Sequence, residues 1–88
     1  MNTSTRASEL LQQALNTARD AERTVSDLIA AHEYQDVTVL LTQAAIALLE
    51  SAALLMQSNS EAAFDEMDKA EDLLDAVYAI IDGEIDEN

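Results

Sequence analysis

The chain has no cysteine, no proline and a single glycine, Gly83. Without cysteine it can form neither a disulfide nor a thiolate metal site. A sheet protein of 88 residues needs several tight turns, and turns draw on glycine and proline. The scarcity of both residues therefore favours an all-α chain, which needs only two or three short connections.

Basic residues are also scarce. Four lysines and arginines stand against 18 acidic residues, so the formal net charge is −14. A charge of this sign repels nucleic acid and anionic membranes and attracts basic surfaces. We therefore expect a basic protein surface as the partner, with no direct contact to nucleic acid or to a membrane. No basic and then apolar leader opens the sequence, so we expect a cytoplasmic protein.

Helical spacing of apolar residues recurs three times along the chain. The spacing predicts helices over about 5–32, 36–58 and 61–82. Because the lengths are similar and the connections short, we expect an all-α, antiparallel three-helix bundle. The break near residues 33–36 contains neither glycine nor proline, so one continuous helix through this point is the alternative.

Three residues are expected to end or begin these helices. Asp36 and Ser60 are suited to N-caps, and Gly83 is suited to a left-handed C-terminal cap. At this length the chain makes one domain. We predict a helical-bundle domain over residues 1–83 and a frayed acidic tail over 84–88.

The middle helix is apolar on two sides, because residues 37–60 carry one charged side chain, Glu50. An ordinary surface helix has one apolar stripe. The stripe assigned to the core is Val37, Leu40, Leu41, Ala44, Ala47, Leu48, Ser51, Leu54 and Leu55. The second stripe is Val39, Ile46, Leu49, Ala53 and Met56.

A small bundle leaves this second stripe in water, although a large apolar side chain gains roughly 1.5–3 kcal/mol on burial. The stripe therefore predicts a homodimer interface. Two alternatives remain: the outer helices cover the stripe, or a foreign partner binds it. A membrane span over residues 37–56 is a third, opposed by Gln43, Glu50 and Ser51 within the segment.

Acidic residues of the last helix fall on one line. Asp65, Asp68, Asp72 and Asp75 recur at helical spacing, which separates neighbouring carboxylates by about 5–6 Å, close to phosphate spacing. A solvated face and adaptation to high salt both explain such a row. The functional hypothesis is a mimic of nucleic-acid phosphates that docks on a basic groove. Its predicted partner-binding residues are Glu61, Asp65, Asp68, Glu71, Asp72 and Asp75.

Metal and catalytic chemistry have little support in the sequence. His32 is the single histidine, and it falls at the expected end of the first helix. The acidic residues lack the Glu-x-x-His pairs of carboxylate-bridged metal bundles. There is no cysteine nucleophile and no phosphate-binding loop. We therefore expect no metal, no cofactor and no enzymatic activity.

These features predict a small acidic homodimer that inhibits or regulates a basic partner, such as a nucleic-acid-binding protein, through surface mimicry. In size and charge it resembles the phage- and plasmid-encoded inhibitors, which include anti-CRISPR proteins, anti-restriction proteins and DNA mimics. The alternative function is that of a structural or adaptor module. Such a module would bind a partner helix, or a second copy, through the second stripe of the middle helix.

Overall fold

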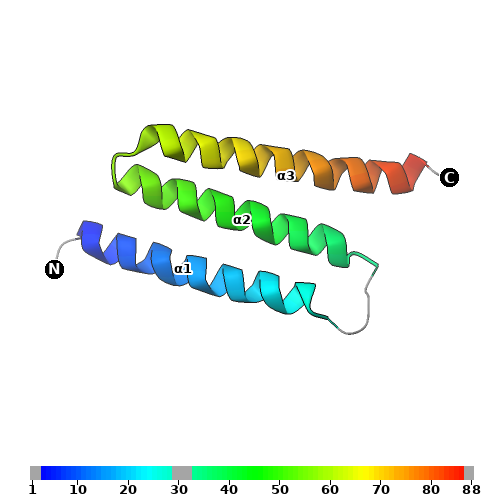
Figure 1. Cartoon of the computed structure of the whole chain (residues 1–88), viewed down its shortest axis with the longest axis horizontal. Coiled ribbons are helices and arrows are strands. Elements are labelled where there is room, and N and C mark those ends of the chain that lie inside the picture. The colour runs from blue at the N-terminus through cyan, green and yellow to red at the C-terminus, as the bar shows by residue number, and fades with distance from the viewer. Residues whose placement is uncertain (1–2, 29–32, 87–88) are drawn as a thin grey trace.

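The computed structural model describes residues 3–28 and 33–86 of the chain. Three helices follow one another: α1 (Thr3–Ser26), α2 (Gln35–Met56) and α3 (Ser60–Asp86). They lie side by side with α2 in the middle, and successive helices run in opposite directions (Figure 1). The predicted all-α architecture of three antiparallel helices is confirmed, whereas assembly into a homodimer stays a prediction.

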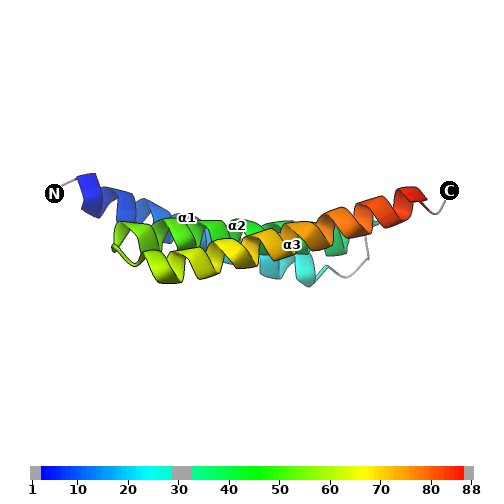
Figure 2. The same cartoon turned by 90° about the horizontal axis from the view of Figure 1, so that it is seen from above.

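The three helices form an open layer. α2 contacts both neighbours, but in the described residues no Cα atom of α1 comes within 8 Å of one in α3. The principal extents are 55 × 28 × 15 Å, and the view from above shows how shallow the layer is (Figure 2). The radius of gyration is 15.5 Å, against about 12 Å for a compact domain of this length. The layer therefore leaves two broad faces open.

Small side chains fill the contact between α2 and α3. The nearly inaccessible residues of these two helices are Val37, Ala44, Ala47, Ser51, Ala63, Ala70 and Val77. Alanine at a helix contact allows the two backbones to approach closely. The buried Ser51 hydroxyl donates to the carbonyl oxygen of Leu48 at 2.7 Å, so it is satisfied locally. No large side chain in the described part of the chain is completely buried.

The first connection differs from the prediction. α1 ends at Ser26, six residues before the predicted boundary at 32. Nε2 of Gln35 donates to the carbonyl oxygen of Val25 at 2.8 Å, and this bond satisfies a carbonyl of the last helical turn. Residues 29–32, with His32, lie outside the described residues. The N-cap prediction for Asp36 is wrong: Tyr34 is the N-cap, and Asp36 lies in the first turn, where its charge suits the helix dipole.

The second connection is a tight turn with a left-handed residue. Ser58 has a φ of 60°, its N–H donates to Leu55 O at 3.0 Å, and Asn59 N–H donates to Leu54 O at 2.9 Å. This pair of bonds is the Schellman arrangement, in which glycine usually takes the left-handed position. Oδ1 of Asn59 accepts from Ala62 N–H at 3.3 Å. Asn59 therefore caps α3, and the prediction of Ser60 as the cap is one residue late.

The end of α3 also differs from the prediction. The helix continues through Gly83 to Asp86, so the predicted boundary at 82 is wrong. Gly83 is not a left-handed cap, because no described glycine has a positive φ. A helical glycine costs only about 1 kcal/mol relative to alanine, which is too little to end a helix by itself. Residues 84–86 are helical where a frayed tail was predicted, and residues 87–88 lie outside the described part.

Candidate interaction surface

One face of the layer is polar. Glu22 of α1, Gln43 and Ile46 of α2 and Lys69 of α3 line one shallow hollow, so all three helices contribute to this face. Nε2 of Gln43 donates to Oε2 of Glu22 at 2.8 Å. We call this side, marked by Glu22, Gln43 and Lys69, the polar face.

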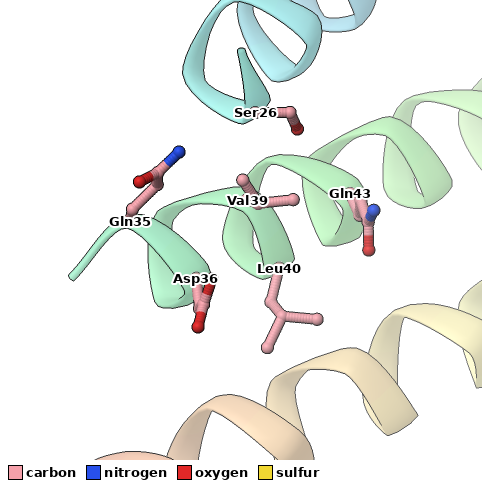
Figure 3. A pocket seen from close by; sticks show the side chains of 6 residues that line it. All are labelled: Ser26, Gln35, Asp36, Val39, Leu40 and Gln43. Atoms are coloured by element: carbon pink, nitrogen blue, oxygen red, sulfur yellow. The ribbon is translucent and has the colours of Figure 1, made fainter. Parts of the chain in front are cut away.

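A second hollow lies at the start of α2 (Figure 3). It is lined by Ser26, Gln35, Asp36, Val39, Leu40 and Gln43. Val39 lies near the middle of the group, and the Leu40 side chain extends toward α3 (Figure 3). Within the described ranges, no three histidine, cysteine, aspartate or glutamate side chains come together to hold a metal ion. The expected lack of metal and of catalysis stays a prediction.

The opposite face is apolar. Leu41, Leu48 and Leu55 follow one another every seven residues along α2, and they are 44%, 49% and 50% exposed. At about 100° per residue, these leucines lie about 120–160° around α2 from Gln43. They therefore project from the side of the layer that faces away from the polar hollows.

α3 adds three large apolar side chains to the same side. Phe64 is 58% exposed, Tyr78 is 62% exposed, and Met67 is also exposed. Each of the three lies about 140–180° around α3 from Lys69, so they share the side of the α2 leucines. We call this surface the leucine face: Leu41, Leu48, Leu55, Phe64, Met67 and Tyr78.

α1 extends this apolar surface at its margin. Leu10 is 46% exposed and lies about 120° around α1 from Glu22. All three helices therefore contribute apolar side chains to one side of the layer.

The residues predicted for the dimer interface are mostly covered. Val39, Ile46, Leu49 and Ala53 are half-buried, and Met56 is exposed. Val39 and Ile46 line hollows together with Ser26 and Arg19 of α1, so α1 covers much of this stripe. Their role in a dimer stays a prediction.

The sequence reasoning missed the leucine face. It assigned Leu41, Leu48 and Leu55 to the core, and their exposure shows that this assignment is wrong. The physical reason is that small residues, such as Ala44, fill the α2–α3 contact and leave the leucines outside it. The seven-residue spacing of the three leucines was the signal available in the sequence.

Five of the six predicted acidic residues form one exposed row. All six are exposed: Glu61, Asp65, Asp68, Glu71, Asp72 and Asp75. The four aspartates each stand two positions from Ala63, Ala70 or Val77, the residues that face α2, and therefore about 160° around the helix from that contact. Among the described residues, none of the six takes part in an ion pair. Glu71 follows Ala70 directly, so it stands about 100° from the α2 contact, at seven-residue spacing between Phe64 and Tyr78 of the leucine face. We call the other five carboxylates, on the outer side of α3, the acidic edge: Glu61, Asp65, Asp68, Asp72 and Asp75.

The length and composition of α2 are those of a possible membrane span. Within the described residues, it is the one helix that is long and apolar enough to cross a membrane by length and composition. A single such helix is weak support for a span, because core helices of soluble proteins share these properties. In the layer, two polar side chains of α2, Gln43 and Glu50, are bonded to α1.

Comparisons with models of protein families, with curated proteins and with solved structures find no match for this chain. The functional proposals therefore rest on its own two surfaces, the leucine face and the acidic edge.

Proposed function

We propose that this protein is a small binding module that works by burying its leucine face against another protein. The observation that carries the proposal is the exposure of six large apolar side chains on one side of a layer in which mainly small side chains fill the contact between α2 and α3. Contiguous apolar patches of this kind usually mark a protein interaction site. Full burial of such a side chain contributes roughly 1.5–3 kcal/mol. About half of each side chain is still exposed, so burying that half against a partner contributes about 1 kcal/mol per residue.

A membrane is a poorer occupant for this face than a protein. Insertion of α2 as a span would separate Glu50 from Arg19 and Gln43 from Glu22, with which they form bonds of 2.7 Å and 2.8 Å. It would also place two unpaired polar side chains in hydrocarbon, where each costs several kcal/mol. The ten acidic residues of α3 would meet repulsion at an anionic lipid surface.

Recovery of bound proteins from the source cells tests the proposal. The tagged chain would be compared with Leu41→Glu/Leu48→Glu and with a control pair on the acidic edge, Asp68→Asn/Asp72→Asn. Circular dichroism would verify that both variants stay helical. We expect the leucine pair to lose the bound protein and the control pair to retain it. Retention by the leucine pair would contradict the proposal.

A second candidate function uses the acidic edge. We propose that this row docks on a basic groove and inhibits or regulates a nucleic-acid-binding partner by mimicry. The observation in its favour is that five carboxylates are exposed on the side of α3 that faces away from α2. The two candidates are compatible, because the leucine face and the acidic edge point in different directions.

Charge and salt separate this candidate from the first. Binding through the acidic edge should be lost in Asp68→Asn/Asp72→Asn and should weaken steeply as salt rises to about 0.5 M. Isothermal titration with the recovered partner at two salt concentrations measures this dependence. An affinity that does not change with salt would remove the mimicry hypothesis.

A further inference from the structure

The accessible surface of the single chain is larger than a compact protein of its mass requires. The chain exposes 6184 Å², whereas a folded monomer of 9.6 kDa exposes about 5,100 Å². A standard interface buries about 800 Å² on each partner. The excess of about 1,100 Å² is therefore enough for one stable interface.

The leucine face is suited to a copy of itself. A seven-residue repeat of leucine forms a seam that pairs along the length of an identical helix. Ala45 and Ala52 lie between the leucines, and their small size permits close approach of a second α2. The one charged residue of α2 beyond Asp36 is Glu50, which pairs with Arg19 of α1, so the seam itself brings no like charges together.

The charges of the outer helices decide how the two copies are related. α3 carries ten acidic residues and one lysine, whereas α1 carries three acidic residues and three arginines. A two-fold axis along α2 places α3 of each copy over α1 of the other. A two-fold axis across the helices places the two α3 helices over each other, where their carboxylates repel. The first arrangement is therefore favoured.

We propose that the leucine face binds a second copy of this chain, related to the first by a two-fold axis that runs along α2. This inference rests on the proposed binding role of the leucine face. The two α2 helices are then parallel, and each leucine meets its own equivalent. Such an interface is isologous, with the same surface used on both copies. The two acidic edges stay exposed on the outside of the assembly.

Light scattering after gel filtration tests the second copy. We expect a mass of two chains for the wild type and of one chain for Leu48→Glu. Ile80→Glu is the matched control, because it adds the same charge in place of an exposed apolar residue on the Lys69 side of α3. It should retain the dimer mass. If Leu48→Glu fails to fold, Leu48→Ala takes its place, because alanine preserves helix propensity. Leu48→Ala should raise the dissociation constant of the dimer at least about tenfold.

Single cysteines test the axis, since the natural chain has none. Leu41→Cys, Leu48→Cys and Leu55→Cys should each form a disulfide between identical chains, whereas Asp65→Cys on the acidic edge should not. Cross-linking at Leu48→Cys alone would overturn the parallel arrangement.

The outcomes also separate this inference from the proposed function. A wild-type mass of one chain, together with loss of a different protein in Leu41→Glu/Leu48→Glu, would overturn the second copy and leave the binding role of the face intact. If the wild type has the mass of one chain and Leu41→Glu/Leu48→Glu still recovers the same bound proteins, the second copy and the binding role of the leucine face are both overturned.

Discussion

Nη2 of Arg19 lies 2.7 Å from Oε1 of Glu50, the single charged side chain in residues 37–60. The pair joins α1 to the central helix on the polar face, beside the hydrogen bond from Gln43 to Glu22. An apolar helix such as α2 has little else to specify which of its sides meets α1. These two polar contacts therefore favour the orientation that leaves the leucine face open.

A double-mutant cycle measures the strength of this pair. We expect Arg19→Gln and Glu50→Gln to show a coupling of about 0.5 kcal/mol in urea unfolding, because both side chains are at least one-third exposed and solvent screens them. The coupling should shrink as salt is added. The Arg23–Asp20 pair, about 70% exposed on both sides, is the control and should show a coupling near zero. Equal couplings for the two pairs would contradict this role for Arg19 and Glu50.

Ser58 occupies a position that suits glycine. A left-handed backbone costs a residue with a Cβ atom about 1–2 kcal/mol, and Ser58 has a φ of 60°. We expect Ser58→Gly to raise the free energy of unfolding by about 1 kcal/mol, measured by urea unfolding at one protein concentration. Ser8→Gly, within α1, is the control and should lower it by about 0.5 kcal/mol. Loss of stability in both variants would show that the left-handed conformation at Ser58 carries no strain.

The sequence predicts the three helices well and their faces poorly. Apolar spacing located α2 and α3 to within a few residues, because that spacing reports directly on helical periodicity. For α2 the spacing cannot say which stripe meets a neighbour, since leucine, isoleucine or valine stands on nearly every side. The decision between Leu48 and Ile46 depends on contacts with residues distant in sequence, such as Glu22 and Lys69.

The sequence also predicted the helix ends poorly, for a physical reason. Asn59 and Ser60 have side chains that can cap a helix, and the backbone of Gly83 can take the left-handed conformation of a C-terminal cap. Which residue caps a helix depends on the path of the chain beyond it. The bond from Asn59 to Ala62 N–H and the continuation of α3 past Gly83 are decided by that path.

Gly83 provides a direct test of the end of α3. It lies inside the helix, and a Cβ atom added there would meet nothing within 4 Å. We therefore expect Gly83→Ala to raise the free energy of unfolding by about 0.5 kcal/mol and to increase the helical signal in circular dichroism. Ala79→Gly, an exposed helical position one turn earlier, should lower stability by a similar amount. If Gly83→Ala instead lowered stability, Gly83 would be a left-handed cap.

The alanine contact between α2 and α3 predicts strict limits on side-chain size. Ala70 is 1% exposed and sits midway between Ala63 and Val77 in the row that faces α2. Ala70→Leu must therefore separate the helices or force a strained rotamer, and we expect it to lower the free energy of unfolding by about 1–3 kcal/mol. Ala76→Leu, exposed on the same helix, is the control and should change stability by less than about 0.5 kcal/mol. Urea unfolding measures the change in the free energy of unfolding for both variants. Equal changes would mean that α2 and α3 are not in close contact at Ala70. In that case, close packing of alanines is not what excludes the leucines from the core.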